Sequence, residues 1–129
     1  MDNFMKIFQE RDALANHFGI QLLEVRPGYA RAKMTVGPEL LNGLGVTHGG
    51  TIFSLADIVF AAASNSHGIP ALALNVNISF IKASKEGAVL TATAEEENIT
   101  RKTGLYRMVV RDDSNELIAT AQGLVYRRG

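Results

Sequence analysis

The side chains best suited to chemistry lie between residues 41 and 68, in the run LNGLGVTHGGTIFSLADIVFAAASNSHG. Between residues 51 and 63 the only polar side chains are Thr51, Ser54 and Asp57. A segment that is apolar on almost every side predicts a helix inside the protein. A carboxylate on such a helix is costly unless it is paired, hydrogen-bonded or used in a reaction. Asp57 is therefore a candidate catalytic residue, and a carboxylate satisfied by backbone donors is the alternative.

A glycine loop, His48-Gly49-Gly50, comes directly before this predicted helix. The first N–H groups of a helix have no partner within the helix, and the positive end of its dipole favours negative charge. Glycine also lets a ligand come close to the backbone. We therefore expect Gly49 and Gly50 to favour a developing oxyanion at the start of the helix that carries Asp57.

Around this segment the sequence predicts one amphipathic helix and one hairpin. Apolar residues at three- and four-residue steps from Phe4 to Phe18 predict a helix that ends near Gly19 and packs its apolar stripe into the core. Residues 20–36 change to a period of two around Arg26-Pro27-Gly28-Tyr29, which suits a type II turn. This pattern predicts a hairpin.

Four strand-like runs follow the central helix, at residues 71–82, 89–98, 105–112 and 116–127. In the first run, alternation places five apolar residues on one face: Leu72, Leu74, Val76, Ile78 and Phe80. No spacing suits a parallel crossover, so we expect a mainly antiparallel meander. A sheet that curls around the apolar helix would bury both. The chain is thus predicted to be one α+β domain, residues 1–129.

Composition narrows the classes of function. The chain has 13 Lys plus Arg and 13 Asp plus Glu, so no overall charge favours nucleic acid or an anionic membrane as a partner. The absence of cysteine removes disulfides, thiolate metal ligands and a cysteine nucleophile. The three histidines show no metal-ligand spacing, so we expect no metal. The N-terminal residues lack the apolar stretch of a signal peptide, and we expect a cytoplasmic protein.

The whole chain resembles the hotdog-fold thioesterases, in particular the phenylacetic acid degradation type. The resemblance rests on Asn42-Gly43, His48-Gly49-Gly50 and Asp57, with weaker similarity at residues 77–80 and 103–106. It implies a hotdog fold, in which a curved, mainly antiparallel sheet wraps around a long central helix. It also implies hydrolysis of acyl- or aryl-coenzyme A thioesters without a metal or redox cofactor. The active sites would lie between the chains of a homodimer, and dimers usually pair into homotetramers.

The same resemblance assigns roles to four residues. The Gly49 N–H would polarise the thioester carbonyl. Asp57 would activate a water as general base, the role that we favour, or attack the carbonyl to give a mixed anhydride. Asn42 would hold the carbonyl or the water, or only cap the turn before Gly43. His48 would donate to the substrate or lock the loop.

The spacing between Gly49 and Asp57 indicates a shared site. Eight residues of α-helix rise about 12 Å, which is too far for both groups to reach one carbonyl carbon within a chain. If both act, Asp57 meets the glycine loop of a second chain whose helix runs antiparallel across a two-fold axis. We therefore expect the active site at a dimer interface.

Further candidates would bind the substrate. Gly50 lies next to the expected donor, and Phe53 and Phe60 are expected to line the acyl pocket with neighbours from the partner chain. Four basic residues near strand ends are candidates for binding the phosphates of coenzyme A: Lys82, Lys85, Arg101 and Lys102. The expected acyl group is phenylacetyl-type or medium-chain.

Two other functions stay open for this sequence. A non-catalytic acyl-CoA-binding module would keep the pocket and tolerate loss of Asp57. A dehydratase or hydratase of the same fold would need a histidine paired with an acidic residue in a different loop. The loop His48-Gly49-Gly50 followed by Asp57 does not match that pattern.

Overall fold

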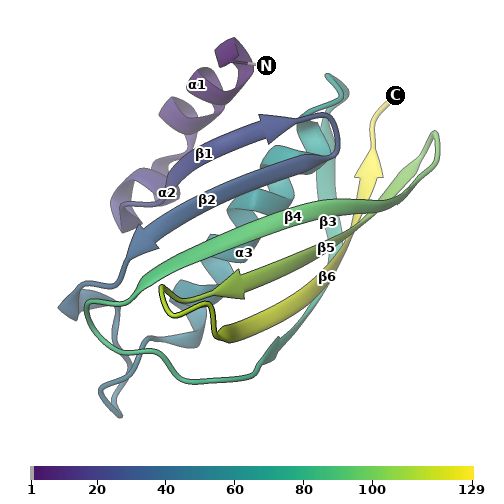
Figure 1. Cartoon of the computed structure of the whole chain (residues 1–129). Coiled ribbons are helices and arrows are strands. Elements are labelled where there is room, and N and C mark those ends of the chain that lie inside the picture. The colour runs from purple at the N-terminus through teal and green to yellow at the C-terminus, as the bar shows by residue number, and fades with distance from the viewer. Residues whose placement is uncertain (1) are drawn as a thin grey trace.

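The computed structural model describes residues 2–129 and contains a six-stranded sheet, three α-helices and one 3-10 helix within them (Figure 1). In chain order the elements are α1 (Asp2–Arg11), α2 (Ala13–Phe18), β1 (Gln21–Arg26), β2 (Tyr29–Thr35), η1 (Pro38–Leu40), α3 (Gly49–Asn65), β3 (Ala71–Phe80), β4 (Val89–Ile99), β5 (Thr103–Arg111) and β6 (Leu117–Arg127). The predicted hairpin, buried helix and four strands are all confirmed, with ends that differ by a few residues.

The sheet has the order β1-β2-β4-β5-β6-β3, and every neighbouring pair is antiparallel. It curls around α3, which crosses its inner face, while α1 lies outside the β1 edge (Figure 1). The predicted α+β class is confirmed. The predicted mainly antiparallel meander is correct in strand direction but wrong in strand order, because β3 lies at the far edge beside β6. Helix α3 carries the chain across the sheet to that edge, and residues 81–88 return it to the neighbour of β2.

The N-terminal segment forms two helices where one was predicted. The chain turns at Asp12, whose Oδ1 accepts a hydrogen bond from the Ala15 N–H at 3.0 Å and caps the start of α2. Phe4 and Phe8 pack against the edge of the core but stay partly exposed, and Ile7 is 41% exposed. The predicted packing of this stripe into the core therefore holds only in part.

The core lies between α3 and the inner face of the sheet. The Phe60 ring is 1% exposed and packs against the Tyr106 ring, with 5.9 Å between centroids. It also lies directly on the backbone of Gly123 in β6, where an added Cβ would stand 2.5 Å from Phe60 Cζ. The close approach of helix and sheet at this point therefore requires glycine at position 123.

Strand β3 is an edge strand with a bulge. Its register with β6 shifts between Ala73 and Asn75, so the alternation of faces changes phase at Leu74. Val76 pairs with Gly123 and faces α3, whereas Leu72 pairs with Tyr126 on the outer face. The prediction that five apolar residues of this strand share one face is therefore wrong.

No helix within residues 2–129 is long and apolar enough to cross a membrane.

Candidate active site

At the N-terminus of α3, His48 accepts a hydrogen bond from one of the two glycine N–H groups and not from the other. His48 is the N-cap residue, and its Nδ1 accepts a hydrogen bond from the Gly50 N–H at 2.8 Å. The His48 carbonyl oxygen accepts from the N–H groups of Thr51 and Ile52, at 2.9 and 3.2 Å. Within residues 2–129 the Gly49 N–H has no hydrogen-bond acceptor. Of the two glycines, Gly49 is thus the one whose N–H can donate to a ligand.

The loop before α3 is held by Asn42 and Thr47. Asn42 Oδ1 accepts hydrogen bonds from the N–H groups of Leu44 and Val46, at 2.9 and 3.3 Å, which closes a tight turn. Thr47 donates from its N–H and its Oγ1 to the carbonyl oxygen of Ser84, at 2.9 and 3.1 Å. The side-chain oxygen of Asn42 is thus used within the loop, whereas the side-chain nitrogen, Nδ2, makes no hydrogen bond in the described chain.

Asp57 lies two turns along α3 and is only partly buried. Among residues 2–129 its carboxylate accepts no hydrogen bond and forms no ion pair, so the structure shows no backbone donor that satisfies it within this chain. Burial raises the pKa of Asp57, and the negative charge of Asp12 raises it further. Ser54, one turn earlier, donates from its hydroxyl to the Gly50 carbonyl oxygen at 2.8 Å and makes no hydrogen bond with Asp57.

The remaining candidates are spread over the molecule. Phe53 is partly exposed, whereas Phe60 is a core residue that faces the sheet. Lys82 and Lys85 flank Ser84, which holds the loop before α3. Arg101 and Lys102 lie in the turn between β4 and β5. That turn is near the other end of α3, because Arg127 N–H donates to the Lys102 carbonyl oxygen and Arg128 N–H to that of Pro70. Within one chain the four basic residues do not form one patch.

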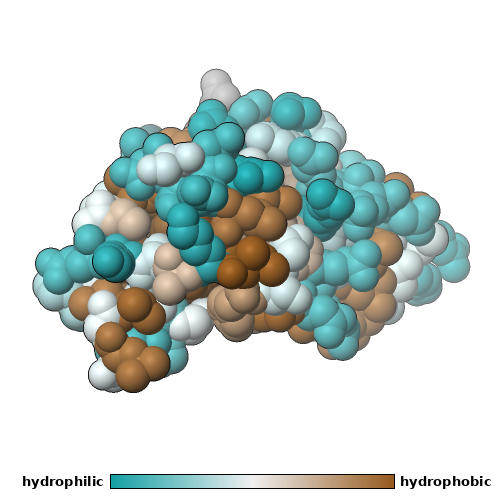
Figure 2. Space-filling model, turned by 60° about the horizontal axis from the view of Figure 1, so that its bottom comes forward, coloured by the Kyte–Doolittle hydropathy of each residue, from teal (hydrophilic) through white to brown (hydrophobic). Residues whose placement is uncertain are grey.

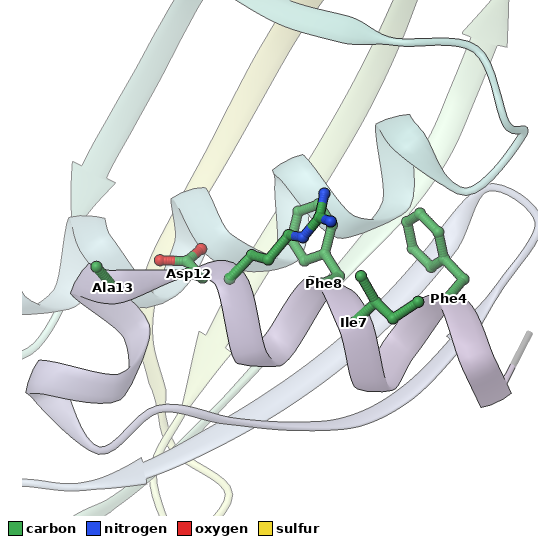
Figure 3. Close-up of a pocket in the computed structure, with 6 residues that line it drawn as sticks. Phe4, Ile7, Phe8, Asp12 and Ala13 are labelled. Atoms are coloured by element: carbon green, nitrogen blue, oxygen red, sulfur yellow. The ribbon is translucent and has the colours of Figure 1, made fainter.

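Two features of the N-terminal helices were not anticipated from the sequence. One is Asp12, which comes close enough for its charge to act on Asp57 although 45 positions separate them. The other is a cavity of about 550 Å³ beside α1. The amphipathic pattern of residues 4–11 was the available signal, but it predicted packing into the core equally well. Figure 3 shows the side chains that line this cavity, which come from residues 4–13.

The architecture defines the class of this protein: one curled antiparallel sheet wrapped around a long central helix is the hotdog fold. Residues 44–119 match the model of the thioesterase superfamily. The chain belongs to the thioesterase superfamily.

Three relatives are informative about this chain. It is 49% identical over 118 residues to a putative esterase of Archaeoglobus fulgidus, covering 92% of this chain and 77% of that one. It is 38% identical over 120 residues to the acyl-coenzyme A thioesterase PaaI of Escherichia coli, covering 93% and 86%. The structure of E. coli PaaI superimposes with a TM-score of 0.95 over 98% of this chain and 92% of that chain, at 35% identity. A Streptococcus mutans protein solved bound to acetyl CoA matches with a TM-score of 0.82 and 25% identity, over 85% and 89%.

Proposed function

We propose that this protein hydrolyses acyl-CoA thioesters to the free acid and coenzyme A. The observation that carries the proposal is that one helix, α3, offers both the Gly49 N–H and the Asp57 carboxylate, neither of which has a hydrogen-bond partner among residues 2–129. These are the two groups that thioester hydrolysis needs, an oxyanion donor and a base or nucleophile. The name of E. coli PaaI and the acetyl CoA bound to the S. mutans protein support the same substrate class.

In the reaction, the Gly49 N–H donates to the thioester carbonyl oxygen and stabilises the negative charge that develops there. Asp57 takes a proton from a water whose oxygen attacks the carbonyl carbon. The C–S bond then breaks, and coenzyme A leaves as the thiolate, which takes up a proton. Alternatively, an Asp57 oxygen attacks and forms a mixed anhydride that water hydrolyses in a second step. The Asn42 Nδ2 is free to hold the carbonyl or the water, and His48 keeps the Gly49 N–H in position.

We infer a homodimer as the catalytic unit, because Gly49 and Asp57 are about 12 Å apart along one helix. The outer edge of β3 has no neighbouring strand in the described chain and carries exposed apolar residues, Leu72, Leu74, Phe80 and Ile81. Figure 2 shows apolar surface on the side of the molecule toward the start of α3. Two β3 edges paired across a two-fold axis would cover these residues and continue the sheet. A homotetramer of two such dimers and a cytoplasmic location are further expectations from the resemblance.

The dimer would also bring the basic residues together. With antiparallel helices and Asp57 opposite Gly49 of the partner subunit, the second half of α3 runs beside the partner's glycine loop. Arg101 and Lys102 of one protomer then approach Lys82 and Lys85 of the other. The phosphates of coenzyme A would bind there, and this binding would weaken as salt is added.

Gly49→Pro tests the oxyanion donor directly. Proline removes the N–H and adds a ring, suits the first position of a helix, and suits the extended backbone of His48 (φ −64°, ψ 138°). We expect kcat to fall by about 10²–10³-fold. Gly49→Ala is the matched control: it keeps the N–H and adds a Cβ 3.3 Å from the partly exposed Phe80 ring. Equal kcat values for the two variants would contradict the role of the Gly49 N–H.

Mixing two inactive variants tests the shared site. Asp57→Ala and Gly49→Pro homodimers each lack one group in both sites. After unfolding and refolding together, a mixed dimer combines the intact Asp57 of one chain with the intact Gly49 of the other. About a quarter of the wild-type sites should return, since half of the dimers are mixed and each has one intact site. If no activity returns in the mixed dimers, the site is not shared between the two chains.

Free-thiol release from a panel of acyl-CoAs tests the reaction itself. The protein has no cysteine, so a thiol reagent reports only the coenzyme A that is released. We expect release by the wild-type protein and loss of release in Asp57→Ala. Binding of acyl-CoA without release from any substrate would support a non-catalytic acyl-CoA-binding module instead.

A further inference from the structure

Thr47, the residue directly before His48, is bound to Ser84 by three hydrogen bonds. The Thr47 N–H and Oγ1 both donate to the Ser84 carbonyl oxygen, at 2.9 and 3.1 Å, and Thr47 Oγ1 accepts from Ser84 Oγ at 2.6 Å. We call this contact the Thr47–Ser84 clasp. Both residues are 5% exposed, so a polar atom that lost its partner here would find little water to replace it.

The sheet holds the Ser84 side of the clasp in place. Ser84 lies within residues 81–88, the segment between β3 and β4, which passes beside the loop that precedes α3 (Figure 1). At one end of this segment the Ile81 N–H donates to a carbonyl oxygen of β6 at 2.8 Å. At the other end the Gly87 N–H donates to the carbonyl oxygen of Val36, directly after β2, at 2.8 Å. The clasp therefore rests on a segment that is tied to the sheet at both ends.

The start of α3 is held from a second side by Leu40. Its carbonyl oxygen accepts from the His48 N–H at 2.9 Å and from Thr51 Oγ1 at 3.2 Å. The backbone that carries the Gly49 N–H is thus fixed between Leu40 and Ser84. Such precision matters for an oxyanion donor, which must lie about 2.7–3.1 Å from the atom where charge develops. A displacement of about 1 Å can lower the rate by about 10²-fold.

We infer that Thr47 and Ser84 are positioning residues, which act through the backbone of the glycine loop to hold the Gly49 N–H where it meets the oxyanion. The inference rests on the proposed thioesterase function and adds to it a part for the segment between β3 and β4. The clasp is buried and does not touch the substrate, and the neighbouring Lys85 side chain is exposed and takes no part in it. Loss of the clasp should therefore lower kcat and leave KM nearly unchanged.

Thr47→Val tests the clasp, because valine has nearly the shape of threonine but lacks the hydroxyl. Thiol release is measured with phenylacetyl-CoA and decanoyl-CoA. We expect kcat to fall by about tenfold, less than for loss of the N–H itself, with KM nearly unchanged. Thr47→Ser keeps the hydroxyl and should keep most of the wild-type kcat.

Ser66→Ala is the matched control for losing a buried hydroxyl. Ser66 is 7% exposed and lies at the opposite end of α3, where its Oγ accepts from the Gly28 N–H at 2.8 Å and donates to the Ala63 carbonyl oxygen at 2.6 Å. Its loss should lower the urea midpoint of unfolding, as Thr47→Val does, but leave kcat at the wild-type level. Equal falls of kcat in the two variants would overturn the inference.

The double variant Thr47→Val, Ser84→Ala separates positioning from stability. Thr47→Val alone leaves the Ser84 hydroxyl buried without an acceptor, whereas the double variant removes this hydroxyl as well. The urea midpoint should therefore recover in the double variant. The clasp is still missing, so kcat should stay about tenfold low. The double variant also decides the inference if Thr47→Val alone does not fold.

Two results would overturn the inference and leave the proposed function standing. One is a wild-type kcat in Thr47→Val, and the other is a kcat that recovers together with the urea midpoint in the double variant, which would give the clasp a role in stability alone. A wild-type protein that releases no thiol from any acyl-CoA would overturn the proposed function and, with it, the inference.

Discussion

The imidazole of His48 accepts a hydrogen bond from the Gly50 N–H, with 2.8 Å between Nδ1 and N. One side chain thereby occupies the second N–H of α3 and leaves the first, that of Gly49, without an acceptor in the described chain. The interaction also fixes which imidazole nitrogen carries hydrogen in the neutral ring, since Nδ1 accepts. The loop therefore distinguishes its two glycines, although the sequence presents them as equivalent neighbours.

We predict that His48→Ala loses both stability and activity, while His48→Asn keeps most of each. Alanine removes the N-cap, which should lower the free energy of unfolding by about 1 kcal/mol and loosen the turn that positions the Gly49 N–H. Asparagine is a good N-cap residue and can accept from the same Gly50 N–H. Urea unfolding and thiol release measure the two effects. A His48→Asn protein that is as stable as wild type but inactive would show that the imidazole itself contacts the substrate.

The acid side of the pH–rate profile should report Asp57. As base or nucleophile, Asp57 must be ionised, and burial together with the charge of Asp12 raises its pKa above the ordinary value of 3.8. Asp12→Asn removes that charge and keeps the cap of α2, because asparagine caps as well as aspartate. The acid limb of kcat/KM should therefore move to lower pH in Asp12→Asn. The exposed Asp113→Asn is the control, and an equal movement in both variants would contradict the link between Asp12 and Asp57.

The same raised pKa predicts how stability depends on pH. Between the ordinary and the raised pKa of Asp57, the folded chain binds more protons than the unfolded chain, so the free energy of unfolding falls as pH rises through this window. Asp57→Asn is uncharged throughout and lacks this loss. It should be more stable than wild type at pH 7, and the difference should shrink as the pH approaches 3.8. Urea unfolding at several pH values measures it, and a destabilised Asp57→Asn protein at pH 7 would contradict the absence of a partner for the carboxylate.

The sequence predicted the local elements of the fold better than their positions in space. The turn at Pro27-Gly28 was predictable because Gly28 adopts a positive φ of 77°, which proline followed by glycine favours. The place of β3 beside β6 was not, since strand order depends on contacts far apart in the chain. The bulge at Leu74 has no local signal, and it reversed the face that alternation assigned to Leu72.

The candidate site divides in the same way. The HGG loop and Asp57 have recognisable spacing along one helix, so their pairing on α3 was predictable. The proximity of Asp12 to Asp57 depends on how the N-terminal helices fold back, which no pattern in residues 2–19 specifies.

The weaker resemblance at residues 103–106 includes Tyr106, which is buried. Its hydroxyl donates to Glu96 at 2.9 Å, and Glu96 also contacts His67 at 2.7 Å. This contact ties the end of α3 to the sheet.

Gly123→Ala should destabilise the fold at the contact between α3 and β6. The new Cβ would stand 2.5–2.8 Å from three atoms of the Phe60 ring, which is enclosed and has no room to move. Overpacking of this kind typically lowers the free energy of unfolding by about 1–3 kcal/mol. Gly43→Ala is the control, because its Cβ would meet no atom within 4 Å. The double variant Gly123→Ala, Phe60→Leu should recover part of the loss, since leucine is shorter. If urea unfolding gives Gly123→Ala and Gly43→Ala the same stability, the ring does not rest on the backbone of β6.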